Sequence, residues 1–390
     1  MKIAKAMDRL GTETAFEVLL RARQLEAQGR DIVHLEIGEP DFDTPPNIVE
    51  AAIRALRDGQ THYSPSPGIP ELRQAVADQV AATRAVEASP DQVVITPGAK
   101  PIMFFAILAL VEPGDEVIVP DPGFPIYESM VRFVGGVAVS ATLSEENGFR
   151  IDPAEVREKA SERTVMLILN SPHNPTGGVL DRSDLEALAQ IVLEQDMWVL
   201  SDEIYARTLY GGQHASIMSL PAMQERTILL DGFSKAYAMT GWRLGYGVMP
   251  ESLAIHMARL MTNSNSCTAT FTQWAGVEAL RGPQDAVDEM VAAFRRRRAA
   301  VVSGLNRIPE LSCAEPQGAF YAFPRITETG MDDEEFADHL LQEAGVAVLA
   351  GRSFGAGGAG YVRISYATSV ARIEEGLRRI EASLPQRVRA

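Results

Sequence analysis

Short apolar segments alternate with helical segments between residues 92 and 235, and this rhythm restricts the possible folds more than any other feature of the chain. The segments VVIT at 93–96, EVIVP at 116–120 and TVMLILN at 164–170 carry almost no polar residue, as is typical of strands buried on both faces. Helical patterns at 101–111 and 180–195 separate such segments. We therefore predict an α/β fold with a mostly parallel sheet covered by helices on both sides.

Unusual polar or glycine-containing clusters follow four of the predicted strands. In parallel sheets, ligands bind beyond the carboxyl ends of the strands, and these ends meet at one edge. We therefore expect the clusters to converge on a single site. They are Gly98–Lys100, Asn174, Asp202 with Tyr205, and Lys235.

The pattern changes towards both ends of the chain. Before the alternating region, we expect a helix over 12–29, a short strand over 31–38 and helices over 48–59 and 68–83. After about residue 285, long helices and short strands dominate, so the pattern alone places a domain boundary there.

Composition excludes several classes of function. The formal net charge of −16 argues against nucleic-acid binding, and the basic run FRRRRAA at 294–300 is predicted to be a solvated helix face. The longest uncharged apolar run, 101–111, is too short to cross a membrane. Two cysteines, Cys267 and Cys313, suggest a reducing compartment, and we expect a cytoplasmic protein.

The predicted strand ends offer an unusual set of chemical groups. The Gly98–Lys100 turn before a helix could cradle an anion, although an ordinary turn is the alternative. Lys235 in apolar surroundings would have a lowered pKa, and Asp202 at the end of a buried strand needs a cationic or hydrogen-bonding partner, unless it only caps the next turn. With Arg243 for a phosphate, these groups suit pyridoxal 5′-phosphate (PLP), which has a phosphate, a pyridine nitrogen and an aldehyde.

Three motifs in the sequence resemble a known family. SKAYAMTGWRLGY at 234–246, NSPHNPTGG at 170–178 and SDEIY at 201–205 are similar to the class I/II aminotransferases of PLP fold type I, especially the bacterial aspartate-aminotransferase-like subgroup. The resemblance implies a large PLP-binding domain over 46–284 with a mostly parallel seven-stranded sheet. It also implies a smaller α/β domain, formed by 1–45, with its N-terminal arm, and 285–390.

The resemblance also implies residue roles around the cofactor. Lys235 would form the Schiff base, and Asp202 would keep the pyridine nitrogen protonated. Tyr205 and Asn174 would bind the ring hydroxylate, and Phe124 would stack on the ring. The implied phosphate-binding residues are Gly98, Ala99, Lys100, Arg243 and Ser234, which adjoins the lysine.

The same resemblance implies a substrate site and a partner subunit. Arg363 would grip the substrate α-carboxylate, with Gly38, Phe124 and Asn174 lining the site and Phe16 helping to close it. Tyr63 would reach the phosphate bound by a neighbouring subunit, which implies a homodimer with shared active sites.

Four positions depart from the family pattern. Gly232 stands where many relatives have a phosphate-binding serine, and His173 precedes NPTG where asparagine is usual. Arg352 and Ala350 replace a small residue and a proline. We expect a structural role for His173, and we consider Arg352 either a reader of a distal carboxylate or an outward-facing residue.

The implied activity is ping-pong transamination between an L-amino acid, with aspartate a candidate, and a 2-oxo acid such as 2-oxoglutarate. Alanine, aromatic or broad specificity is also open. The alternatives are a PLP-dependent lyase on the same fold and a non-catalytic regulator domain.

Overall fold

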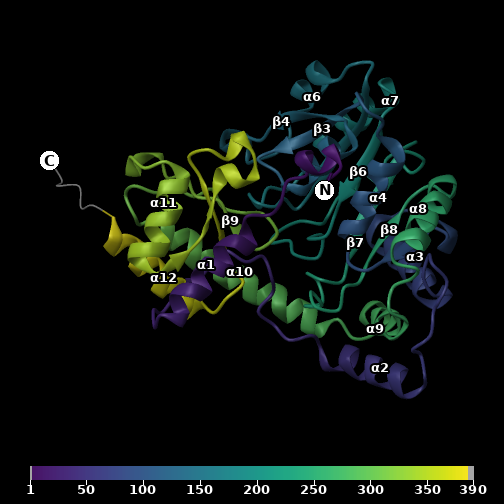
Figure 1. The fold of residues 1–390 in the computed structure, drawn as a ribbon, viewed down its shortest axis with the longest axis horizontal. Coiled ribbons are helices and arrows are strands. Elements are labelled where there is room, and N and C mark those ends of the chain that lie inside the picture. The colour runs from purple at the N-terminus through teal and green to yellow at the C-terminus, as the bar shows by residue number, and fades with distance from the viewer. Residues whose placement is uncertain (1, 385–390) are drawn as a thin grey trace.

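A seven-stranded sheet forms the centre of the computed structural model, which describes residues 2–384 (Figure 1). Its strand order is β2-β8-β7-β6-β5-β3-β4, and only β8 runs antiparallel to its neighbours. The predicted, mostly parallel α/β architecture is therefore confirmed. The strands are β2 Val93–Thr96, β3 Glu116–Asp121, β4 Val137–Thr142, β5 Thr164–Asn170, β6 Trp198–Asp202, β7 Thr227–Gly232 and β8 Gly245–Val248.

Helices cover both faces of this sheet, which explains its continuously apolar strands. Met166 and Ile168 of β5 pack in one core with α4, α5 and α8. Leu167 and Leu169 point to the other face, where α6 and α7 cover the sheet, and α3 and α9 cover the same face further along. The helices are α2 Pro46–Arg57, α3 Pro70–Arg84, α4 Lys100–Leu110, α5 Ile126–Val134, α6 Pro153–Lys159, α7 Arg182–Glu194, α8 Glu251–Ser264 and α9 Thr270–Arg281.

The strand register brings the predicted polar residues to one edge of the sheet. Asn170 at the end of β5 lies opposite Asp202 at the end of β6, and Asp202 lies opposite Leu230 of β7. The chain leaves β7 at Gly232, three residues before Lys235. The expected convergence at the carboxyl edge therefore follows from parallel pairing alone.

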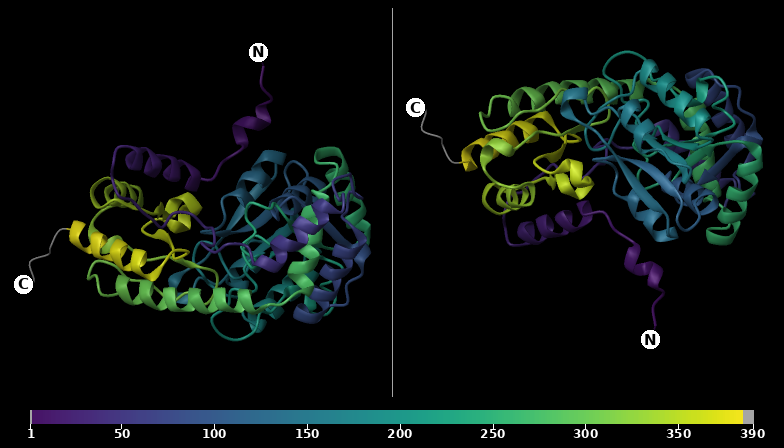
Figure 2. Two further views of the ribbon diagram at one scale, coloured as in Figure 1. Left: turned by 90° about the horizontal axis from the view of Figure 1, so that it is seen from below. Right: turned by 90° about the horizontal axis from the view of Figure 1, so that it is seen from above.

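A second group of elements packs around its own core beside the sheet. This core joins residues of β1, β9, β10 and β12 to three helices, and it includes Val33, Phe294, Tyr321 and Ile364. Figure 2 shows the N-terminal segment before α1 projecting at the surface, where its Arg9 and Gly11 form hydrogen bonds with residues of α5. The elements are α1 Ala15–Ala27, β1 Val33–His34, α10 Asp285–Leu305, β9 Tyr321–Ala322, α11 Asp333–His339, β10 Val346–Ala347, β11 Leu349–Ala350, β12 Val362–Ser365 and α12 Val370–Ser383.

Two N-terminal elements differ from their predictions. The strand expected over 31–38 is limited to Val33–His34, because only these residues pair, with β10. The helix expected over 12–29 forms as α1, but Phe16 and Leu20 on it are 63% and 59% exposed. The helical spacing of apolar residues therefore predicted that a helix forms here, but it did not predict that two of these residues are exposed.

The basic run at 294–300 also differs from expectation. It lies on α10, and Arg295 and Arg296 are exposed as predicted. Arg297, however, is buried, donates to both carboxylate oxygens of Asp41 at 2.5 and 2.8 Å, and stacks on Phe42. The prediction of a fully solvated face was wrong because a bidentate ion pair compensates the burial of one arginine. No helix within residues 2–384 is long and apolar enough to span a membrane.

Candidate active site

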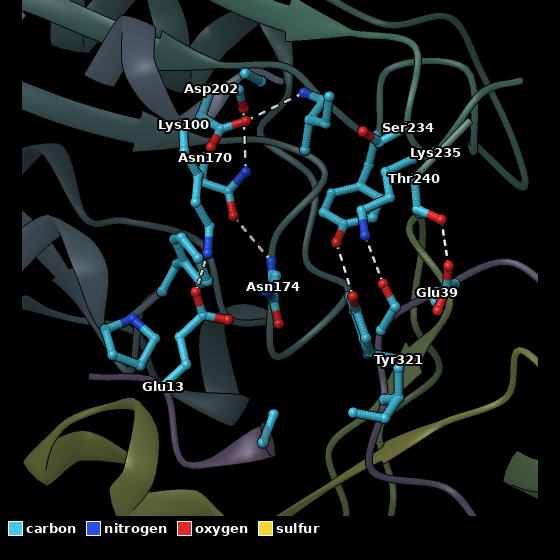
Figure 3. A pocket seen from close by; sticks show the side chains of 18 of the residues that line it. Glu13, Glu39, Lys100, Asn170, Asn174, Asp202, Ser234, Lys235, Thr240 and Tyr321 are labelled. Atoms are coloured by element: carbon cyan, nitrogen blue, oxygen red, sulfur yellow. Dashed lines mark hydrogen bonds and ion pairs between the residues drawn. The ribbon is translucent and has the colours of Figure 1, made fainter. Parts of the chain in front are cut away.

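A cavity of about 560 Å³ opens at the carboxyl edge of the sheet, where the two cores meet. Most predicted site residues line it, and Figure 3 shows several of them pointing towards one another. The predicted residues in the lining are Phe16, Gly38, Ala99, Lys100, Phe124, Asn174, Asp202, Tyr205, Ser234, Lys235, Arg243 and Arg363.

Asp202 is a buried carboxylate at the end of β6. Its Oδ2 accepts a hydrogen bond from the Tyr127 hydroxyl at 2.6 Å, and its Oδ1 accepts one from the Ile204 amide at 3.2 Å. Burial raises the pKa of Asp202 to about 6 despite these two donors. The carboxylate therefore lacks a cation, and a positively charged ligand atom would favour its ionised form.

Lys235 lies in the turn after β7, and its amine donates to the Gly38 carbonyl oxygen at 2.5 Å. Burial, followed by the nearby charge of Arg363, lowers the pKa of Lys235 to about 8. A substantial fraction of this amine is therefore neutral near pH 8, as a nucleophile or a general base requires.

Arg363 on β12 faces the cavity from the other core. Its guanidinium donates to Asn174 Oδ1 at 2.9 Å and to the Glu36 carbonyl oxygen at 2.6 Å, and it stacks on Tyr321 and Phe354. Its Nε is buried without a hydrogen-bond partner, and burial lowers the pKa of Arg363. A buried cation with an unpaired donor is suited to an anionic ligand.

An anion cradle lies at the N-terminus of α4, where the first amides have no partner within the helix. Gly98 has a φ of +88°, and a Cβ there would lie 2.3 Å from Nη2 of Arg243. The guanidinium is thus held against the backbone, and it donates to the Thr240 carbonyl oxygen at 2.7 Å. Gly98 itself stands behind the lining, since its missing side chain makes room for Arg243.

Aromatic side chains complete the walls. Phe124 packs edge-on against Tyr127 with ring centroids 5.5 Å apart, and the hydroxyls of Tyr205 and Tyr321 are 2.7 Å apart. A Cβ on Gly38 would lie 2.1 Å from the Tyr321 hydroxyl, so this position requires glycine.

A buried ion cluster lies behind Asp202. Arg84, the last residue of α3, donates to Glu203 at 3.0 Å and to Asp231 at 2.6 Å. Burial opposes the ionisation of Glu203, but His214 and Arg84 lower its pKa to about 2. The cluster links the ends of β6 and β7. Asp202 ends β6, and Lys235 lies in the turn that follows β7.

Besides glycines, three polar residues singled out in the sequence lie outside the lining. Tyr63 is 88% exposed. His173 is buried and bonds Thr176 Oγ1 at 2.8 Å, and burial lowers its pKa to about 3, which agrees with the expected structural role. Arg352 lies outside the lining and pairs with Asp333 at 2.8 Å, which favours the outward-facing interpretation over that of a reader of a distal carboxylate.

The departure at Gly232 has a structural reason. Gly232 pairs with Gly245 of β8, and a Cβ on Gly232 would lie 3.0 Å from the Gly245 Cα. Ser234 lines the cavity, whereas Gly232 does not. The hydroxyl near the cradle therefore comes from Ser234.

Sequence reasoning missed several lining residues. Tyr127 lies in the first turn of α5, three residues after the predicted Phe124, which precedes the helix, so its proximity to that ring was the one available signal. Glu13, Thr240 and Tyr321 reach the site through loops and long-range packing, for which the sequence carries no local signal.

The fold and this constellation of lysine, carboxylate and two arginines define a PLP-dependent transferase of fold type I. Within that class, the chain belongs to the aminotransferase class I and II family, whose model matches residues 30–380. The chain is therefore an aminotransferase, and the family implies dependence on PLP. This assignment to an aminotransferase takes the place of the two alternatives considered from the sequence, a PLP-dependent lyase and a non-catalytic regulator domain.

Named relatives cover almost the whole chain. An aspartate aminotransferase of Pyrococcus abyssi is 43% identical over 92% of this chain and 93% of its own. An aromatic-amino-acid aminotransferase of Thermococcus litoralis is 43% identical over 93% and 94%, respectively. The structure of an aspartate aminotransferase from Thermus thermophilus with maleate superposes with a TM-score of 0.95 at 40% identity, covering 98% of this chain and all of that one.

Proposed function

We propose that this aminotransferase holds PLP in the cavity and moves an amino group from an L-amino acid to a 2-oxo acid in two half-reactions. One observation carries the proposal. A buried carboxylate, an amine with a lowered pKa and a buried arginine with an unpaired Nε face the same cavity.

The residues present fit the cofactor group by group. The α4 N-terminus, at Ala99 and Lys100, would hold the phosphate together with Ser234 and Arg243. Asp202 would pair with the protonated pyridine nitrogen, which supplies the cation that this carboxylate lacks. Phe124 would lie against the ring, and Tyr205 and Asn174 would bind its hydroxyl group.

When bound, PLP supplies an electron sink for the negative charge that develops at the substrate Cα. The amine of Lys235 would anchor the aldehyde and, once released, would take the proton from the substrate Cα and deliver it to the carbon that was the aldehyde carbon. Arg363 would orient the α-carboxylate through two or more charge-assisted hydrogen bonds, with Gly38 leaving room beside it. Phe16, at the cavity mouth, would help exclude water.

We also propose a homodimer. The support is Tyr63, whose ring is 88% exposed in the single chain and outside its cavity, together with exposed apolar residues of the N-terminal segment such as Ile3 and Phe16. We propose the domain division 46–284 against 1–45 with 285–390, supported by the separate core around α10 and α12. Sedimentation of the purified chain tests the dimer, and loss of PLP affinity in Tyr63→Phe tests the shared site.

A donor and acceptor panel tests the function. The PLP-loaded chain is mixed with aspartate, alanine, phenylalanine and leucine, each with 2-oxoglutarate or pyruvate, and oxo acid and ammonia are measured. We expect oxo acid formation without ammonia, a change in the absorbance of the bound cofactor on adding donor alone, and loss of both in Lys235→Ala. Turnover by Lys235→Ala equal to that of the unmodified chain would refute the role of the amine.

A further inference from the structure

An ion pair spans the cavity between two distant parts of the chain. The carboxylate of Glu13, two residues before α1, contacts the amine of Lys100 at the start of α4, and the two positions are 87 residues apart in sequence (Figure 3). The Glu13 side chain is 19% exposed and the Lys100 side chain 50% exposed. The N-terminal segment thus places a negative charge inside the site.

The cations of the cavity show why this pair matters. Among the described residues that line it, four are lysine or arginine: Lys100, Lys235, Arg243 and Arg363. The proposed function assigns Lys235 to the aldehyde, Arg243 to the phosphate and Arg363 to the α-carboxylate. The side-chain amine of Lys100 is the cation left over for a second substrate carboxylate, and Glu13 already occupies it.

The negative charge also reaches the substrate groups. The Glu13 carboxylate favours the charged forms of both Arg363 and Lys235, so its field extends to the proposed positions of the α-carboxylate and the amine. Glu39, whose carboxylate accepts a hydrogen bond from Thr240, adds a second negative charge to the lining. A dicarboxylic substrate would have to displace Glu13 against this field, whereas a neutral side chain leaves the ion pair intact.

The remaining wall of the cavity is suited to an apolar side chain. Phe354 packs on the guanidinium of Arg363 at 4.8 Å, next to the proposed α-carboxylate position. The apolar lining residues include Phe16, Ile37, Met103, Phe124, Leu349 and Phe354.

We propose that Glu13 determines specificity by occupying Lys100, so that this site selects amino donors with neutral, apolar side chains over aspartate. The inference rests on the proposed function. Because donor and acceptor use the same cavity, it also favours a monocarboxylic 2-oxo acid such as pyruvate over 2-oxoglutarate.

Glu13→Gln tests this directly, since it removes the charge and keeps the size. We expect the ratio of kcat/KM for aspartate to that for phenylalanine to rise on the order of tenfold, because Lys100 becomes free for a charge-assisted hydrogen bond. The double variant Glu13→Gln/Lys100→Met should lose this gain. Glu17→Gln removes a charge from an exposed position on the same segment, outside the lining, and should leave the ratio unchanged.

Binding provides a second readout without turnover. Maleate, a dicarboxylate without an amino group, and 3-phenylpropionate, a monocarboxylate, are titrated into the PLP-loaded chain, and the cofactor absorbance is followed. We expect Glu13→Gln to tighten maleate binding about tenfold relative to 3-phenylpropionate.

The outcomes separate this inference from the proposed function. An unmodified chain that prefers aspartate to phenylalanine tenfold or more overturns the role of Glu13, as does a Glu13→Gln variant with unchanged ratios, while transamination itself stands. If no amino donor alters the bound cofactor, the proposed function fails instead.

Discussion

Replacing Tyr127 by phenylalanine should destabilise the cofactor-free protein more at pH 8 than at pH 5. Tyr127 is buried, and its hydroxyl donates to Asp202 at 2.6 Å. Because the pKa of Asp202 is raised to about 6, this carboxyl is mostly protonated at pH 5 and ionised at pH 8. The variant therefore removes a hydrogen bond to a neutral group at the lower pH and to a buried anion at the higher pH.

The magnitude follows from this difference in charge. A hydrogen bond between neutral groups contributes about 1 kcal/mol to stability and one to a charged group about 1.5–3 kcal/mol, so the cost should grow by roughly 1 kcal/mol between the two pH values. The same difference corresponds to a further rise in the Asp202 pKa of roughly 0.7 units. The sign is consistent with linkage. A carboxyl whose folded pKa is raised contributes stability below its unfolded pKa of 3.8 and loses that contribution as the pH rises through about 6.

Urea unfolding of the cofactor-free protein at pH 5 and pH 8 measures the effect. Tyr210→Phe is the matched control, because this buried hydroxyl donates to the Ala319 carbonyl oxygen, which does not titrate. Its cost should be the same at both pH values. Equal costs for Tyr127→Phe at pH 5 and pH 8 would show that Asp202 does not change its charge over this range, and the account of its burial would be wrong.

Three further predictions concern the amine, the ion cluster and the cradle. The rate at which the cofactor-free protein incorporates PLP should rise with pH and level off above about 8, since the lowered pKa of Lys235 sets the fraction of neutral amine. Stopped-flow absorbance measures this rate, and a rate that falls from pH 7 to pH 9 would contradict the prediction. Arg84→Met leaves the buried Asp231 without its cation and Glu203 with only His214, and it should cost about 3–5 kcal/mol in urea unfolding, against less than about 0.5 for the exposed Arg182→Met. Gly98→Ala should weaken PLP binding at least tenfold, as measured by equilibrium dialysis, because the added Cβ would displace Arg243 from the cradle. The control Gly148→Ala, also at positive φ but with open space around it, should bind PLP normally.

The sequence predicted the sheet and the residues at its carboxyl edge well, because both depend on simple regularities. Continuous apolar runs identify strands covered on both faces, and parallel pairing then aligns Asn170, Asp202 and the start of the Lys235 turn. Glycine-rich β8 was not anticipated, since a four-residue strand of GYGV has little strand pattern.

Long-range contacts account for most of what could not be predicted. Glu13 pairs with Lys100, Tyr321 bonds Tyr205, and Arg297 bonds Asp41 across 87, 116 and 256 residues of chain, respectively. Each pair joins two elements whose relative position is set by the packing of both cores. Local periodicity therefore cannot show whether a charged side chain such as Arg297 is solvated or paired.

The charges of the site couple ligand binding to stability. Burial shifts Asp202, Lys235 and Arg363 towards their neutral forms, so each charge is costly while the cavity lacks a ligand. The acidic side of the site requires a cation, while the cradle and Arg363 require anions. A ligand that carries a protonated ring nitrogen, a phosphate and a carboxylate satisfies all of these at once. Such a ligand should therefore raise the free energy of unfolding by more than its apolar contacts alone would provide, because it also removes the electrostatic cost that folding imposes on the empty site.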